Sequence, residues 1–116
     1  MTIRALVVAV VLAAAPAVAN AHAMLDHASP AVGSTVSPAP KELVLTFTET
    51  LEPKFSAIEV RNASGASMTS GPARTSGAEM RVGLKPLPAG TYRVMWRVLS
   101  VDTHRTTGSF SFRVGP

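Results

Sequence analysis

Among the side chains of this sequence that could hold a metal ion, those of Asp102, His104 and His22 have the most informative positions. Asp102 and His104 flank Thr103 in a short segment between two stretches of alternating apolar residues. In an extended backbone, residues i and i+2 point the same way, so a carboxylate and an imidazole would be offered to one point in space. Two ligands rarely make a metal site alone. The sequence therefore predicts that a group from elsewhere in the chain completes the site.

His22 can supply that group if the chain is cleaved directly before it. The segment Met1–Ala21 has the features of a secretory signal. Arg4 provides a positively charged start, Ala5–Val18 an apolar stretch, and Ala19–Ala21 the small-residue pattern of a cleavage site. A retained membrane anchor is the competing interpretation, but the apolar stretch falls short of the ~20 residues that a membrane span needs. We therefore expect cleavage after position 21.

The predicted domain organisation is a signal peptide over 1–21 and one exported domain over 22–116. Cleavage leaves 116 − 21 = 95 residues, enough for one domain with a modest core. The chain has no cysteine, so this domain must fold without disulfides. Removal of Arg4 lowers the formal charge from +4 to +3, and the remaining cations are scattered along the sequence, which argues against a nucleic-acid partner. No other long apolar stretch is present, so we expect no membrane insertion of the mature chain. The mature chain is expected to be a monomer.

Cleavage would give His22 a free α-amine, which can chelate one metal ion together with its own ring. An amine, two imidazoles and a carboxylate form a nitrogen and oxygen ligand set that favours a tetragonal ion, with copper(II) first in the affinity order. Protons compete for such ligands below neutral pH, because reference pKa values are about 7.7 to 8.0 for the amine and about 6.5 for imidazole. Taken alone, however, a histidine at a cleavage site can be chance, and an Asp-x-His loop can be a solvated turn.

The rest of the chain has the alternation of strands separated by turns. Predicted strands cover 23–29, 42–48, 57–61, 80–84, 92–99 and 110–114. Residues 31–40 and 49–55 are predicted to be loops or turns, and one or two weak strands are expected within 62–77. Tyr92 and Trp96 share a predicted core face. No segment shows a helical period, so the pattern predicts an all-β fold, an antiparallel Greek-key sandwich or barrel.

Several motifs resemble those of one family, in the family's order and over essentially the whole mature chain. They are His22-Ala23-x-Leu25, Ser29-Pro30-Ala31-x-Gly33, Leu45-x-Phe47-Thr48-Glu49, Gly90-x-Tyr92-x-Val94-x-Trp96-Arg97-Val98-x-Ser100-x-Asp102-x-His104 and Gly108-x-x-x-Phe112. This pattern resembles the CopC family of periplasmic copper-binding proteins. The resemblance implies an immunoglobulin-like or cupredoxin-like β-sandwich in the periplasm that holds one copper(II) ion. It also implies a role in copper homeostasis or resistance, with an inner-membrane CopD-like transporter as partner.

The resemblance also implies which residues bind copper. The implied ligands are His22 through its amine and ring, His104 through its ring and Asp102 through its carboxylate. Glu49 would lie near the ligands and accept a hydrogen bond from the amine, or it is simply an exposed acid at a strand end. Arg97 and Arg105 flank the Asp-x-His segment; either they orient Asp102 by a charge-assisted bond or they are solvated.

The chain departs from the family pattern in two places. The family commonly has glycine between the aspartate and the histidine, whereas this chain has Thr103, which would be strained at a positive φ. Some members carry a methionine-rich loop that binds copper(I) through soft thioethers. The methionines of the mature chain stand apart, so we predict no copper(I) site; they are Met24, Met68, Met80 and Met95. His27 matches no ligand position and is predicted to be a surface residue.

Two other functions compete with that of a copper carrier. A metal-free immunoglobulin-like interaction module would keep its function when His22, Asp102 and His104 are changed. A polysaccharide monooxygenase would also bind copper through an N-terminal histidine, but it needs open positions for oxygen and substrate. Asp102 as an additional anionic ligand would fill one such position and stabilise copper(II) against reduction. We therefore expect a carrier rather than an enzyme.

Overall fold

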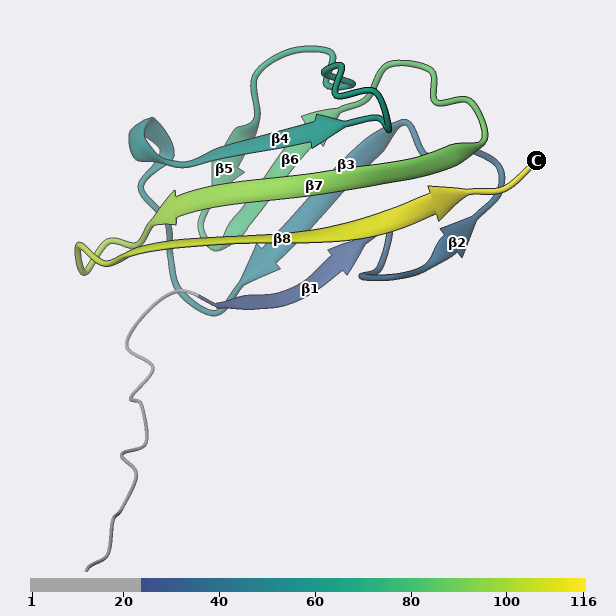
Figure 1. Ribbon diagram of the computed structural model, residues 1–116. Helices are drawn as coiled ribbons and strands as arrows, with labels where there is room; N and C mark the ends of the chain where they lie inside the picture. The colour runs from purple at the N-terminus through teal and green to yellow at the C-terminus, as the bar shows by residue number, and fades with distance from the viewer. Residues whose placement is uncertain (1–23) are drawn as a thin grey trace, which may run out of the picture.

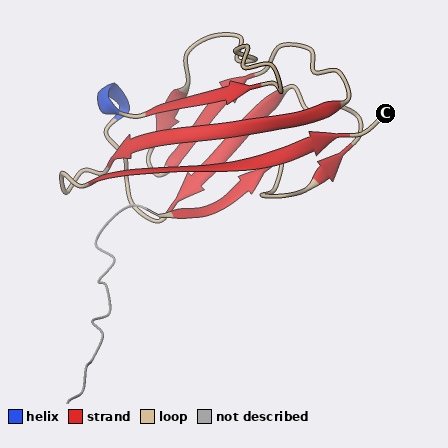
Figure 2. Ribbon diagram, in the orientation of Figure 1, coloured by secondary structure: helices blue, strands red, loops and turns tan. Residues whose placement is uncertain are grey.

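The computed structural model describes residues 24–116, which form two four-stranded β-sheets (Figure 1). The first sheet has the order β1 (Leu25–Ser29), β3 (Glu42–Phe47), β6 (Glu79–Gly83) and β5 (Arg74–Ser76). The second has the order β2 (Thr35–Val36), β8 (Arg105–Val114), β7 (Gly90–Leu99) and β4 (Ala57–Arg61). One short 3₁₀ helix, η1 (Pro53–Phe55), precedes β4 (Figure 2). The predicted all-β, Greek-key sandwich is confirmed, while the predicted signal and His22 lie outside the described residues.

The two longest strands, β7 and β8, form a hairpin that runs the length of the second sheet. They pair in continuous antiparallel register from Gly90 opposite Val114 to Leu99 opposite Arg105. Figure 1 shows that the turn of this hairpin lies at the same end of the molecule as the start of β1 and the end of β3. That end therefore gathers segments from both sheets.

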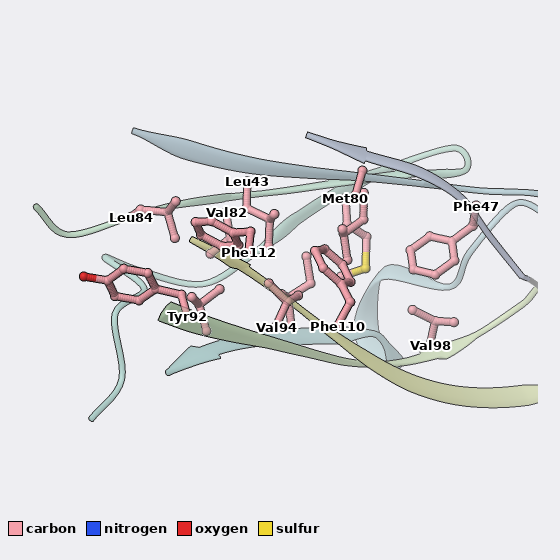
Figure 3. Close-up of a cluster of buried hydrophobic side chains, with 14 of the residues drawn as sticks. Leu43, Phe47, Met80, Val82, Leu84, Tyr92, Val94, Val98, Phe110 and Phe112 are labelled. Carbon is pink, nitrogen blue, oxygen red and sulfur yellow. The ribbon is translucent and has the colours of Figure 1, made fainter. Parts of the chain in front are cut away.

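The core fills the space between the two sheets with side chains from alternate strand positions (Figure 3). The side chains with the least exposure are Leu43, Leu45, Met80, Val60, Val82, Val94, Val98 and Phe112. The predicted core face of β7 is confirmed for Tyr92, which is 3% exposed and stacks on Phe112. Trp96 shares this face but is only partly buried, and its ring packs edge-on against Phe47 at 5.9 Å between centroids.

The largest differences from the predicted strands are an earlier start of the last strand and an additional short strand. The last strand was expected from position 110, but β8 begins at Arg105, because the Thr- and Ser-rich stretch before Phe110 is held by hydrogen bonds to β7 rather than by apolar burial. β2 lies inside the predicted loop 31–40 and pairs in parallel with the end of β8. A strand of two residues leaves no periodic pattern to recognise.

Within residues 24–116, no helix is long and apolar enough to cross a membrane.

Candidate metal centre

The turn between β7 and β8 brings Asp102 and His104 together. Asp102 Oδ1 lies 3.3 Å from His104 Nδ1, and the two side chains are 41% and 45% exposed. The predicted convergence of these two side chains is therefore confirmed, but its structural reason differs from the predicted one. The backbone is not extended here: Thr103 has a φ of +72°, and its N–H donates to the Ser100 carbonyl at 2.8 Å. A tight turn, rather than a strand face, makes the two candidate ligands converge.

Ser100 supports this turn through hydrogen bonds, although it was not predicted to be part of the candidate site. Its side chain is fully buried, and its hydroxyl donates a hydrogen bond to Asp102 Oδ1. Its backbone N–H donates to the His104 carbonyl at 3.0 Å, which closes the turn. The signal was present in the sequence, since a serine precedes the Asp-x-His segment at a fixed distance in the family pattern. Nothing in the sequence indicated that this serine is buried next to the aspartate.

The hydrogen bond from Ser100 lowers the pKa of Asp102, and the neighbouring His104 adds to this effect. Hydrogen bonding to the charged form of a carboxyl group stabilises that form, and here it outweighs the opposing cost of partial desolvation. Asp102 is therefore an anion at any pH at which a histidine ring is free to bind a metal. The ionised carboxylate is the form that a cation requires.

Replacing Ser100 by alanine should raise the pKa of Asp102 towards the ordinary aspartate value. A lowered pKa in the folded state means that the linked stability is present above the ordinary pKa and is lost as the pH falls through the lowered one. The variant should therefore lose part of its resistance to acid unfolding. Carbon-13 NMR of the Asp102 carboxyl group across pH measures the midpoint directly. Ser109→Ala, at an exposed serine of β8, is the control; equal midpoints in the two variants would contradict the role of Ser100.

Thr103 is the only non-glycine residue of the described range with a positive φ. The expected strain is therefore present, because a β-branched side chain is disfavoured in the left-handed region. Replacing Thr103 by glycine should stabilise the domain by about 1 kcal/mol, since relief of strain exceeds the added chain entropy. Thermal unfolding should then occur several degrees higher. Thr103→Ala keeps a Cβ and should gain less; a glycine variant no more stable than the alanine variant would refute this explanation.

The segment Thr48–Thr50 connects this turn to the first described residue. Met24 and Thr48 exchange two hydrogen bonds, Met24 N–H to Thr48 Oγ1 at 2.9 Å and Thr48 N–H to the Met24 carbonyl at 2.9 Å. On its other side the segment receives a hydrogen bond from Val101 N–H to the Thr50 carbonyl at 3.0 Å. The chain at position 24 is thus fixed beside a segment that is hydrogen-bonded to the turn of residues 100–104. This turn is called the metal turn below, because it carries the candidate ligands Asp102 and His104.

The other predicted site residues fall in different places. His22 lies outside the described residues. Glu49 lies on the connecting segment, is partly buried, and its carboxylate forms no hydrogen bond or ion pair with any residue of 24–116. His27 is a surface residue, as expected: its side chain is 68% exposed and lies 3.4 Å from Asp26. Within residues 24–116, no group of three or more metal-binding side chains gathers.

Neither Arg97 nor Arg105 orients Asp102. Both side chains are exposed and line a hollow beside η1, and the contacts of the Asp102 carboxylate come from Ser100 and His104 instead. The physical reason is their place in the strands. Arg97 and Arg105 face outwards from the second sheet, whereas the carboxylate folds back onto the buried serine below it.

The methionines of the described range occupy different parts of the fold. Met80 is fully buried in the core and Met68 packs against it. Met95 is partly buried in β7, and Met24 is 50% exposed at the start of β1. The side chains therefore have four different environments rather than one shared loop.

Comparison with known proteins agrees with the resemblance in the motifs. The CopC domain family model matches residues 25–115, nearly all of the described chain. A copper resistance protein C of Xanthomonas campestris pv. juglandis is 40% identical over 117 aligned positions, which cover 93% of this chain and 91% of that protein. The copper transport protein CutJ of Bacillus subtilis is 31% identical over 86% of this chain, but the matching region is only 19% of CutJ.

Two solved structures share the fold. CopC from Methylosinus trichosporium OB3b superposes with a TM-score of 0.76 at 32% sequence identity, covering 82% of this chain and 95% of that one. PcoC, a methionine-rich copper resistance protein from Escherichia coli, gives a TM-score of 0.68 at 38% identity, covering 81% of this chain and 99% of that one. The fold and the turn thus define a small β-sandwich with a paired aspartate and histidine at one end. The chain belongs to the CopC family.

Proposed function

We propose that the mature protein is a periplasmic copper(II) carrier that begins at His22 and binds one ion. The ligands are the amine and ring of His22, the ring of His104 and the carboxylate of Asp102. The observation that carries this proposal is the turn that holds Asp102 Oδ1 at 3.3 Å from His104 Nδ1. Membership of the CopC family, whose relatives include copper resistance proteins, supports copper as the metal.

The reach of the chain supports His22 as the third contributor. Met24 is fixed to Thr48, and a segment of two residues spans at most about 7 Å when extended. In this proposal the amine and ring of His22 are therefore restricted to a small volume near a segment that is hydrogen-bonded to Val101 in the metal turn. This restriction reduces the conformational entropy lost when the chelate closes.

The ligand set favours copper(II) over softer ions. It contains nitrogen and oxygen donors and no sulfur, and Asp102 adds a negative charge that stabilises the higher oxidation state. Glu49 in this proposal accepts a hydrogen bond from the His22 amine and keeps its lone pair directed at the metal. The dispersed methionines support a single copper(II) site without a second site for copper(I).

The carrier has its role outside the cytoplasm, after removal of residues 1–21. There it limits free copper and delivers the ion to an inner-membrane CopD-like transporter. Support for delivery comes from CutJ, a copper transport protein in which a region similar to this chain is joined to a much longer remainder.

Binding without turnover distinguishes the carrier from an enzyme and from a metal-free module. Protein beginning at His22 is loaded with copper(II), passed through a desalting column and then incubated with ascorbate, oxygen and a polysaccharide. The carrier retains one equivalent of copper and leaves the polysaccharide unoxidised. Oxidised sugar products would instead identify a monooxygenase, and loss of all copper on the column would identify a metal-free module.

A further inference from the structure

The outer face of the second sheet is strongly basic. Strand positions that point away from the core carry five arginines but only one acid. The arginines are Arg61, Arg93, Arg97, Arg105 and Arg113, and the acid is Glu59. That acid already forms an ion pair within the face, because Glu59 Oε1 lies 2.7 Å from Arg61 Nη2. Most of the charge on this face is therefore not balanced within it.

Three cations of this region line one hollow next to the metal turn. Lys54 comes from η1, Arg97 from β7 and Arg105 from β8, and together with Phe55, Ser56 and Ala57 they enclose about 310 Å³. Arg105 pairs with Leu99 across the hairpin, two positions from Arg97, so the two arginines are diagonal neighbours on one face. Arg105 also directly follows the candidate ligand His104.

The cations of the hollow have no acidic partner within residues 24–116. Arg81, on the other sheet, differs from these cations, since it forms ion pairs with both Glu79 and Glu42 at 2.9 Å. Lys54, Arg97 and Arg105 form no such ion pair among the described residues. Like charges held close together repel one another, so a bound anion would lower the free energy of this arrangement.

Phe55 makes the hollow unlike a simple anion site. Its side chain is 60% exposed and forms part of the same lining as the cations. Val101, in the metal turn, is also 50% exposed. An aromatic side chain beside arginines is the combination enriched at the energetic centres of protein interfaces. A small free anion would neutralise the cations but leave Phe55 in water.

We propose that this hollow docks an acidic segment of a partner protein and so places that partner beside the metal turn. Aspartate or glutamate side chains of the segment enter the hollow and pair with Lys54, Arg97 and Arg105, and an apolar side chain of the segment covers Phe55. The role of this docking in copper delivery rests on the proposed function. The binding itself requires no metal, so it can be tested separately.

The test uses metal-free, nitrogen-15-labelled protein beginning at His22. It is titrated with a short synthetic peptide of alternating aspartate and leucine, and with the same peptide carrying asparagine in place of aspartate. We expect amide shifts confined to Lys54–Ala57, Arg97 and Arg105 with the acidic peptide and none with the amide peptide. Raising the salt concentration should weaken the binding, because the charges are exposed.

Two double variants of equal charge separate the hollow from the basic face as a whole. Arg97→Gln with Arg105→Gln should weaken peptide binding about three- to tenfold, as expected for the loss of two exposed ion pairs. Arg93→Gln with Arg113→Gln removes two arginines of the same sheet outside the hollow lining and should change the affinity less than about twofold. Phe55→Ala should weaken the acidic peptide as well, but not the binding of citrate.

Three results would overturn the proposal. Equal weakening in both double variants would mean non-specific attraction to a positive face. Citrate that binds as tightly as the peptide would identify a free anion as the occupant. Vesicles containing phosphatidylglycerol that bind the protein and compete with the peptide, with equal dependence on both pairs of arginines, would identify a membrane surface. None of these results concerns copper, so each leaves the carrier function to its own test.

Discussion

Replacing His104 by alanine should weaken copper(II) binding by about 100-fold or more while the β-sandwich stays folded. The substitution removes one of the two imidazoles of the proposed ligand set and leaves Asp102 without its neighbour in the turn. Even residues that only support a metal ligand typically contribute 10- to 100-fold in affinity, so a direct ligand should contribute at least that much. The side chain of His104 is 45% exposed, so its loss leaves no cavity in the core.

The measurement is a competition titration against a chelator of known copper(II) affinity, with circular dichroism to verify the fold. His27→Ala is a closely matched control. His27 is also an exposed histidine, and it also lies beside a carboxylate, with Asp26 at 3.4 Å. It should retain the parental affinity. A His27 variant that loses as much affinity as the His104 variant would show that the site lies elsewhere or that binding is non-specific.

Replacing Gly108 by alanine should destabilise the domain by about 2 kcal/mol. Gly108 lies directly opposite Trp96 in the β7–β8 hairpin, and a Cβ at position 108 would overlap the six-membered ring of the indole. That ring also packs against Phe47 and Phe110, with centroids 5.9 and 6.2 Å away, so it cannot move without disturbing other aromatic contacts. Overpacking of this kind typically costs 1 to 3 kcal/mol.

A loss of that size should lower the unfolding temperature of a domain this small by about 10 °C. Since the chain has one tryptophan, its fluorescence reports on the displaced ring directly. Gly115→Ala is the control, because a Cβ there would have only ordinary contacts, the nearest being Thr35 Cγ2 at 3.7 Å. If both alanine variants unfold at the temperature of the parent protein, Gly108 is not needed for the packing of Trp96.

Periodicity in the sequence predicted the parts of the fold where alternate side chains are buried. β3 and β4 were found within a residue of their bounds because Leu43, Leu45 and Ile58 mark one inward face. The first half of β8 was missed because Arg105, Thr106 and Thr107 are polar on both faces, and only their partners in β7 make them a strand. Pairing between strands is a property of the tertiary structure, which local pattern does not contain.

The proximity of two candidate ligands was predictable from the sequence, but the residue that supports them was not. Two residues apart, Asp102 and His104 had the right types and spacing, and the structure brings them together. The burial of Ser100 next to Asp102 was not predictable, because it depends on an antiparallel bridge between Ser100 and Leu51, which is distant in the sequence. For Arg97 and Arg105 the sequence left two alternatives, orientation of Asp102 or solvation, and the outward face of the sheet directs both side chains to the hollow instead of the carboxylate.

The most direct test of the copper chelate at the chain start compares two proteins that differ by one residue. One begins at His22 and the other carries an additional alanine before it, which converts the free amine into an amide. Copper(II) is titrated into each and followed by electron paramagnetic resonance. We expect one equivalent bound with nitrogen hyperfine structure in the first protein and binding weaker by at least about tenfold in the second. Equal affinity and identical spectra for the two proteins would contradict a site built on the amine of His22.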